Sequence, residues 1–145
     1  MEIIAKKFSK LTPSELYGIL QLRAKVFVVE QNCVYNDLDG VDEEAYHVFA
    51  VDGGQIVGCL RVIDKGKRLS EVSLGRIVSA SRLKGVGSML VKKGEEIARE
   101  VFGATRIMVG AQVQARAFYE KQGFVKTSDV YLEDGIPHIY MTKKL

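Results

Sequence analysis

The sequence predicts an α/β fold, in which helices flank a mixed β-sheet and the elements follow the order β-α-β-β-β-α-β-α-β-β. Two observations lead to this prediction. Glycine-bearing turns at Asp52-Gly53-Gly54 and Lys65-Gly66-Lys67 join successive strands, which makes those strands antiparallel neighbours. A strand, a long helix and another strand then follow from 69 to 109, and such a unit forces a parallel pair with a right-handed crossover. Ligands of these sheets bind at the carboxyl ends of the parallel strands.

The first half of the chain supplies one strand, one helix and three further strands. The opening strand is expected over residues 2–8. Thr12-Pro13-Ser14-Glu15 is a capping box with proline at the first helical position, and apolar residues at helical spacing extend the helix to about Val29. An acidic loop, Asp37 to Glu44, follows the helix. The next three strands are expected at residues 46–51, 55–63 and about 69–78.

The second half supplies the long helix and the elements that close the sheet. The helix should run from Gly85 to Phe102 and end at Gly103, since glycine readily adopts the positive φ of a helix C-terminus. Its expected apolar face consists of Val86, Met89, Leu90, Ile97 and Val101. The remaining expected elements are a strand at 105–109, a helix at about 113–122, and a hairpin of residues 124–132 and 136–142 around Glu133-Asp134-Gly135.

Composition narrows the class of protein. The 145 residues fit one domain, 1–145, and the formal charge of +3 is too small and dispersed to indicate nucleic-acid binding. No apolar run approaches the ~18 residues of a membrane span, and the N-terminus does not look like a signal peptide. Cys33 and Cys59 lack metal-binding spacing, and His47 and His138 are too far apart to suggest a metal site. We therefore expect a cytoplasmic protein with reduced thiols, no metal and no membrane partner, as a monomer or homodimer.

The turn before the long helix has the character of a phosphate site. It reads Arg82-x-x-Gly85-x-Gly87 and continues into Ser88. The first N–H groups of a helix lack intrahelical partners and carry partial positive charge, so they bind anions. Glycine allows a ligand to approach the backbone closely, and Arg82 and Lys84 add positive charge.

A second motif lies in the following helix, at Ala115-Arg116-Ala117-Phe118-Tyr119-Glu120-Lys121-Gln122-Gly123-Phe124. With both motifs in this order, the chain resembles the GNAT superfamily of acetyl-CoA-dependent N-acetyltransferases over nearly its whole length. Three further stretches, residues 26–32, 35–40 and 134–139, resemble its ElaA-like branch. Two features depart from the usual pattern. Gln112 stands where many members have asparagine, and the connection from Val78 to Arg82 is shorter than usual.

The resemblance implies the GNAT fold and acetyl-CoA as cosubstrate. The third strand and the strand at 105–109 should splay apart, so that their main chains can pair with the pantetheine arm and leave a free N–H for the oxyanion. The acceptor would be a primary amine of a small molecule or a protein, which attacks directly in a ternary complex. The residues expected to bind acetyl-CoA are Ile77, Val78, Arg82, Lys84, Gly85, Val86, Gly87, Ser88, Gln112 and Phe118.

Two roles are open for Tyr119. The resemblance makes it the general acid that protonates the departing thiolate. Alternatively, Phe118 and Tyr119 form an amphipathic pair that packs the helix on the sheet. Ile77 and Val78 can likewise be core residues while their main chains bind a ligand.

The general base also stays open. Glu30, Glu71 and His138 are candidates, each with a structural alternative, and ordered water needs no residue at all. The acidic loop does not match a calcium-binding loop, because Gly40 comes two places too early. It is either a solvated connector or a negative rim that attracts a cationic amine.

Two other functions compete with acetyl transfer. A non-catalytic acyl-CoA-binding sensor would carry the same loop. A dinucleotide-dependent oxidoreductase fits less well, because Leu90 falls where its third fingerprint glycine belongs.

Overall fold

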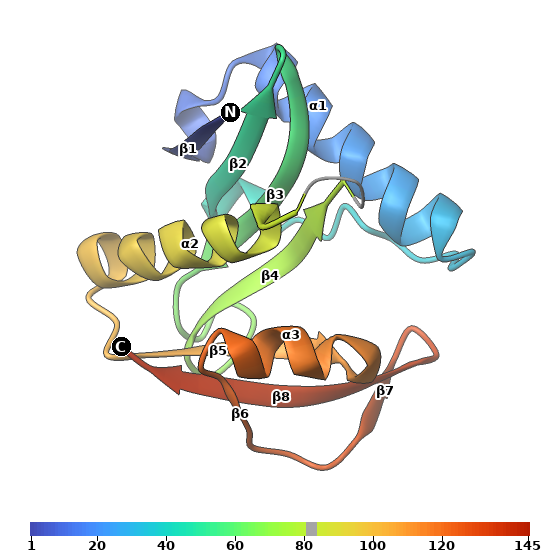
Figure 1. The fold of residues 1–145 in the computed structure, drawn as a ribbon, viewed down its shortest axis with the longest axis vertical. Coiled ribbons are helices and arrows are strands. Elements are labelled where there is room, and N and C mark those ends of the chain that lie inside the picture. The colour runs from blue at the N-terminus through green and yellow to red at the C-terminus, as the bar shows by residue number, and fades with distance from the viewer. Residues whose placement is uncertain (81–83) are drawn as a thin grey trace.

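The computed structural model describes residues 1–80 and 84–145 (Figure 1). Within these residues the strands of one sheet are β1 (Glu2–Lys7), β2 (Tyr46–Asp52), β3 (Gln55–Ile63), β4 (Val72–Ser79), β5 (Arg106–Gln112), β6 (Val125–Lys126), β7 (Tyr131–Glu133) and β8 (Ile136–Lys144). The α-helices there are α1 (Pro13–Arg23), α2 (Val86–Phe102) and α3 (Arg116–Lys121). No helix in the described ranges has both the length and the apolar character needed to cross a bilayer.

The sheet is mixed, as predicted. Its strands lie side by side in the order β1-β2-β3-β4-β5-β8-β6, and β7 also pairs with β8. Every pairing is antiparallel except that of β4 with β5, which is parallel. The predicted strand–helix–strand crossover through α2 is therefore confirmed, and so is the predicted fold class.

The expected strand at 124–132 is wrong as a single element, because it divides into the short strands β6 and β7. The Tyr140 N–H, which a continuous ladder would pair with a main-chain carbonyl, instead donates to Ser128 Oγ at 2.8 Å. The chain then bulges away from β8 between the two strands. The preceding strand is longer than expected, because β5 pairs with β8 from Arg106 to Gln112.

Helix α1 begins at the predicted capping box and changes character at its C-terminal end. Thr12 Oγ1 accepts the Glu15 N–H at 3.1 Å, while Glu15 Oε1 accepts the Thr12 N–H at 2.8 Å. From Ala24 to Glu30 the helix continues with π-type hydrogen bonds, such as Gln31 N–H to the Val26 carbonyl at 3.2 Å. Such wide turns are frequent at functional sites.

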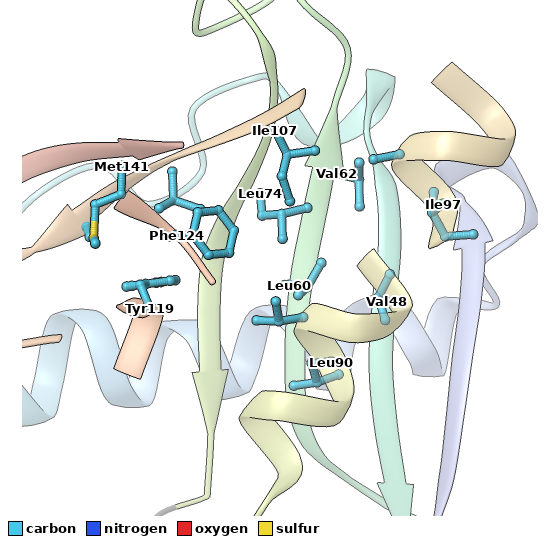
Figure 2. Close-up of a cluster of buried hydrophobic side chains, with 14 of the residues drawn as sticks. Val48, Leu60, Val62, Leu74, Leu90, Ile97, Ile107, Tyr119, Phe124 and Met141 are labelled. Atoms are coloured by element: carbon cyan, nitrogen blue, oxygen red, sulfur yellow. The ribbon is translucent and has the colours of Figure 1, made fainter. Parts of the chain in front are cut away.

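The sheet is covered on both faces (Figure 1). Along β2, Val48 and Ala50 belong to the larger apolar cluster with α2, whereas Phe49 packs with Ile19 of α1. Successive side chains of a strand point to opposite faces, which explains this division. Figure 2 shows the larger cluster, which also includes Tyr119 of α3 together with Phe124 and Met141.

The apolar face of α2 is shifted from the predicted one. Met89 is 38% exposed and Val101 is 45% exposed, so neither belongs to the core. Their places are taken by Val91, Gly94 and Ala98, which are buried. Gly94 is needed there because a Cβ would lie 3.2 Å from the Leu60 and Leu74 side chains. Gly103 ends the helix with φ of +63°, as predicted.

The parallel pair β4–β5 is very short. Its register contains only Val72 opposite Ile107 and Ser73 opposite Met108. Beyond these pairs the strands separate, and Figure 1 shows β4 running away from β5 and α3. β4 begins at Val72 rather than at 69, because the Gly66 N–H donates to the Leu69 carbonyl at 2.8 Å and extends the preceding turn. The separation of β4 and β5 creates the site described next.

Candidate active site

A cavity of about 330 Å³ lies where β4 and β5 separate. Both strands contribute, and the end of the α1 extension, the following loop, α3 and the β7–β8 turn complete the lining. Its lining residues include Phe27, Gln31, Cys33, Tyr35, Gly75, Arg76, Ile77, Val78, Ser79, Gln112, Tyr119, Glu133 and His138. A second, more open hollow of about 770 Å³ lies between α1 and the β2–β3 turn, beside Tyr17 and Ile56.

A β-bulge in β4 shapes one wall of this cavity. In the pairing with β3, Cys59 lies opposite Val78 and Arg61 lies opposite Gly75, so β4 carries one extra residue. Arg76 accommodates the bulge with φ of +50°, an unusual conformation for a residue other than glycine. A bulge leaves a main-chain group without a ladder partner and bends its strand. The bulge bends β4 beside the cavity, and the end of the β4–β5 pairing after Ser73 leaves main-chain groups of β4 without a β5 partner there.

Ile77 and Val78 lie on this wall, and both expectations for them are compatible with the structure. The Val78 side chain packs with Ile19 and Phe49, while Ile77 packs against the larger apolar cluster. Both residues also line the cavity. Their side chains can thus anchor β4 while their main chains face a ligand.

The N-terminus of α2 lies beside the far end of β4. Gly85 is the residue preceding the helix and has φ of +80°, a conformation that suits glycine. Because glycine has no side chain with which to cap the helix, the N–H groups of Val86, Gly87 and Ser88 are left to other partners. Lys84 is exposed at this turn. Arg82, which was expected to assist here, lies outside the described residues.

The side chains around this helix start have packing roles. Val86 is fully buried in the core. A Cβ on Gly87 would lie 3.2 Å from the Phe118 ring and 3.9 Å from Ser79 Oγ, so this glycine lets α3 and β4 approach α2. Ser88 Oγ accepts a hydrogen bond from Gln122 Nε2 at 2.9 Å. Of these residues, only the backbone groups are directed to a ligand by the fold itself.

Tyr119 lines the cavity from α3 and also belongs to the core. It is only 8% exposed, and its ring makes edge contacts with Phe118 and Phe124 at centroid distances of 5.2 and 5.7 Å. Burial raises the pKa of its phenol above the ordinary value. The phenol is therefore a weaker acid than a solvated tyrosine and is protonated at neutral pH.

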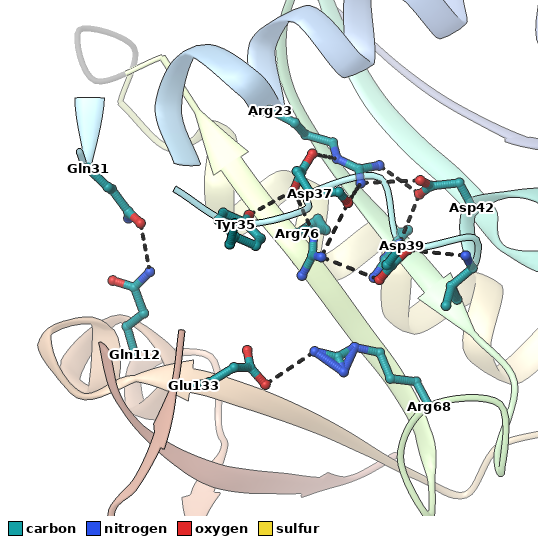
Figure 3. Close-up of polar contacts among 12 residues, drawn as sticks. Arg23, Gln31, Tyr35, Asp37, Asp39, Asp42, Arg68, Arg76, Gln112 and Glu133 are labelled. Atoms are coloured by element: carbon teal, nitrogen blue, oxygen red, sulfur yellow. Dashed lines mark hydrogen bonds and ion pairs between the residues drawn. The ribbon is translucent and has the colours of Figure 1, made fainter. Parts of the chain in front are cut away.

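Polar bridges cross the gap between the two separated parts of the sheet (Figure 3). Gln112 Nε2 donates to Gln31 Oε1 at 3.3 Å across this gap. On the β5 side, Gln114 Nε2 donates to Gln112 Oε1 at 2.7 Å. Arg68 Nη2 donates to Glu133 Oε1 at 3.2 Å. Gln112 was expected near the cosubstrate, whereas sequence reasoning did not identify Gln31, Arg68 or Glu133.

The three candidate bases do not lie together. His138 lines the cavity, 6% exposed, at the start of β8. Glu30 is exposed at the end of the π-helical segment, and Glu71 precedes β4. Neither glutamate is among the cavity-lining residues of the described ranges.

Both interpretations of the acidic loop are wrong, because its aspartates form ion pairs. Arg23 donates to Asp37 Oδ2 at 3.0 Å and to Asp42 Oδ1 at 2.7 Å, and Arg61 donates to Asp39 Oδ2 at 2.6 Å (Figure 3). Three guanidinium groups, those of Arg23, Arg61 and Arg76, thus face three carboxylates. The loop is neither a solvated connector nor an uncompensated negative rim.

This ion-pair cluster fixes another wall of the cavity. Burial alone would raise the pKa of Asp42, but the hydrogen bonds and charges of Arg23 and Arg61 outweigh burial and lower it. Arg76 Nη2 donates to Asp39 Oδ2 at 3.3 Å, and its guanidinium lies 5.5 Å from the centre of the Tyr35 ring. Tyr35 donates in turn to Asp37 Oδ1 at 2.8 Å. The arginine at the bulge therefore holds the loop against β4.

Similarity to known proteins agrees with this geometry. The acetyltransferase (GNAT) domain family matches residues 12–145. Protein ElaA of Escherichia coli K12 is 38% identical over 141 residues, which cover 94% of this chain and 92% of that protein. The crystal structure of Escherichia coli ElaA has a TM-score of 0.89 at 36% identity and covers 99% of both chains.

Two further structures extend the similarity. An acyl-CoA N-acyltransferase from Pseudomonas aeruginosa has a TM-score of 0.90 at 39% identity, with 99% of both chains covered. An aminoglycoside 6′-N-acetyltransferase complexed with coenzyme A has a TM-score of 0.74 at 20% identity, covering 97% of this chain and 96% of that one. The last similarity concerns the fold alone.

Proposed function

This chain belongs to the GNAT acetyltransferase family, in its ElaA-like branch, and we propose that it transfers the acetyl group of acetyl-CoA to a primary amine. The acceptor would be a small molecule or a protein, and its amine would attack directly in a ternary complex. One observation carries the proposal: β4 and β5 pair at only two positions and then enclose a cavity beside the N-terminus of a long helix. Such an opening suits a long ligand with a phosphate group at one end.

The residues present fit this cosubstrate. The N–H groups of Val86, Gly87 and Ser88 would bind its pyrophosphate, since the helix start is capped only by a glycine. Lys84 and Arg82 would add positive charge. The main chains of Ile77 and Val78, on the bulged strand, would pair with the pantetheine arm, and Gln112 would contact it from β5. When bound, acetyl-CoA supplies an acyl group activated as a thioester.

The chain would contribute to the reaction at two atoms. A main-chain N–H freed by the bulge at Arg76 would stabilise negative charge on the attacked carbonyl oxygen, an effect often worth ~3 kcal/mol. The Tyr119 hydroxyl would donate a proton to the departing thiolate. Its position on the cavity wall supports this role, because Tyr119 lines the cavity from α3 opposite Ile77 and Val78 of β4.

The acceptor would occupy the part of the cavity lined by Gln31, Tyr35, Glu133 and His138. Neither Glu133 nor the aspartates of the loop 37–44 would offer a cationic acceptor an unpaired carboxylate there. Arg68 pairs with Glu133, and Arg23, Arg61 and Arg76 pair with the aspartates.

A turnover screen tests this function. Purified protein is incubated with acetyl-CoA and a panel of primary amines, and the release of free thiol is followed together with the mass of the acetylated product. We expect equal amounts of thiol and acetylated amine with at least one acceptor. Tight acetyl-CoA binding without either product across the panel would instead support the acyl-CoA sensor.

A further inference from the structure

We propose that His138 is the base that takes a proton from the acceptor amine, and that Glu133 and Arg68 position it. This inference rests on the proposed function and identifies the residues that prepare the acceptor. Of the three candidate bases, His138 lines the cavity, whereas Glu30 and Glu71 are not among its lining residues in the described ranges.

A hydrogen bond of His138 fixes the tautomer of its neutral ring. His138 Nδ1 lies 2.7 Å from the Ile136 carbonyl oxygen. Because a carbonyl oxygen can only accept, Nδ1 must carry hydrogen, and the neutral ring then has its lone pair on Nε2. The Tyr131 ring stacks on the imidazole at 5.8 Å between centroids and restrains its orientation. The structure thus presents the nitrogen that a base requires.

Glu133 lies close enough to His138 to pair with the protonated ring. Its Oε2 lies 3.6 Å from His138 Nε2, so the imidazolium gains a carboxylate partner when it forms. Its Oε1 accepts from Arg68 Nη2, which reaches across from the β3–β4 connection. Arg68 therefore holds Glu133 in place from the opposite part of the sheet.

The other groups around the cavity do not duplicate this arrangement. The titratable or charged side chains of the described ranges that line it with His138 are Cys33, Tyr35, Arg76, Tyr119, Glu133 and exposed Asp134, and Tyr131 lines an adjoining hollow. Arg76 and Tyr35 are committed to Asp37 and Asp39, and burial keeps Tyr119 protonated. Within this set, His138 is the side chain whose hydrogen-bonding geometry leaves a ring nitrogen lone pair to accept a proton.

The proton balance of the step is simple. The acceptor ammonium gives one proton to His138 Nε2, and the freed nitrogen lone pair forms the C–N bond as the C–S bond breaks. Tyr119 protonates the thiolate and regains a proton as the nitrogen loses its second one. His138 releases its proton to solvent, so one proton is released for each acetyl group transferred.

Two acceptors of different basicity distinguish a base from a structural residue. Benzylamine is protonated at neutral pH and needs a base, whereas methoxyamine is already neutral. In His138→Asn the amide N–H can still donate to the Ile136 carbonyl, but no base remains. We expect kcat/KM at pH 7 to fall about 10²-fold with benzylamine and less than about 3-fold with methoxyamine. Equal losses with both amines, at unchanged CoA affinity, would overturn the inference.

The positioning role of Glu133 has its own readout. In Glu133→Gln the imidazolium loses its partner, so the acidic limb of the kcat/KM profile with benzylamine should move to lower pH. Arg68→Ala should also shift the acidic limb, because Arg68 holds Glu133 in place. The neighbouring control Lys67→Ala should leave it unchanged, since Lys67 pairs with exposed Glu44. An acidic limb that stays in place in Glu133→Gln would contradict the assignment.

A measurement without turnover separates this inference from the proposed function. The chain has two histidines, His47 and His138, so ¹⁵N NMR can assign both rings. We expect neutral His138 to carry hydrogen on Nδ1, with that signal lost in His138→Asn. A neutral ring with hydrogen on Nε2 instead would overturn the inference and leave acetyl transfer unaffected. A wild-type protein that releases no thiol with any amine of the panel would contradict both.

Discussion

At the scale of single residues, Tyr119 has a packing role in the structure and a chemical role in the proposed function. Its ring contacts Phe118 and Phe124 in the core, while its position on α3 also places it on the cavity wall. The sequence motif around Tyr119 indicated both roles without deciding between them. The structure is compatible with both, because the ring packs in the core and the residue also lines the cavity.

Tyr119→Phe should lower kcat by about 10²-fold or more, because the ring stays but the proton donor is lost. Acetyl-CoA affinity and thermal stability should change little. Single-turnover kinetics, followed by thiol release, make the measurement, with Tyr17→Phe on the exposed face of α1 as control. An unchanged rate when chemistry limits turnover would show that another group protonates the thiolate.

Some site residues could be predicted from sequence and others could not, for a physical reason. Tyr119 lies within a local motif, Ile77 and Val78 were expected from the family resemblance, and the structure brings all three to one cavity. Glu133 belongs to the turn sequence Glu133-Asp134-Gly135. Because a turn already accounts for these residues, the sequence does not indicate a further role for Glu133. Its link to Arg68 joins positions 65 residues apart, and no local pattern reports such a pairing.

At the scale of elements, the loop 37–44 illustrates the same limit. A run of aspartates in sequence is typical of a solvated or anion-rich surface. Here the compensating charges come from α1, β3 and β4, at Arg23, Arg61 and Arg76. The loop is consequently a structural element that supports the cavity wall.

Asp42→Asn should destabilise the protein by about 3 kcal/mol, because it leaves the buried Arg23 and Arg61 without a full charge partner. The pKa of Asp42 is lowered by folding, so its contribution is present above its unfolded pKa of about 4 and is lost as pH falls. Urea unfolding should therefore show a large gap to wild type at pH 7 that narrows toward pH 3. Exposed Glu43→Gln is the control, and a gap independent of pH would contradict this account.

The start of α2 is the proposed binding site for the phosphate end of CoA. Lys84→Ala should weaken CoA binding several-fold at low salt and less at 0.5 M salt, where the Debye length has fallen to about 4 Å. Calorimetry of CoA binding makes the measurement. Lys92→Ala, which removes the same charge from an exposed position further along the helix, should have a much smaller effect. Equal losses from both variants would indicate general charge attraction rather than a site at this turn.

Sequence predicted the elements themselves better than their ends. The capping box at Thr12 and the terminating Gly103 are local signals, and both lie where predicted. The division of the strand at 124–132 depends on Ser128, whose hydroxyl competes with the main chain for the Tyr140 N–H. Secondary-structure propensity and hydrophobic periodicity do not predict such competition for a hydrogen bond.

At the scale of the whole molecule, the sheet has two parts that diverge from a common start. β1 to β4 with α1 and α2 form one part, while β5 to β8 with α3 form the other. The parts share a two-position parallel register and side-chain bridges such as Gln31–Gln112 and Glu95–Lys143. Hairpin signals and the crossover rule predicted this topology, but the abrupt end of the parallel pairing was implied only by the family resemblance.

CoA should stabilise the whole fold, because its proposed site spans both parts. At a CoA concentration 100 times the Kd, the free energy of unfolding should rise by about 2.7 kcal/mol. Adenosine 3′,5′-bisphosphate lacks the pantetheine arm and should stabilise less at the same concentration. Thermal unfolding with each ligand makes the comparison, and equal stabilisation would argue against pantetheine binding between β4 and β5.

A crystal structure of the protein with bound CoA tests the proposed binding site. We expect the pyrophosphate at the N–H groups of Val86, Gly87 and Ser88, the pantetheine arm along Ile77 and Val78, and the sulfur near the Tyr119 hydroxyl. CoA bound instead in the hollow between α1 and the β2–β3 turn, or with its sulfur away from Tyr119, would contradict it.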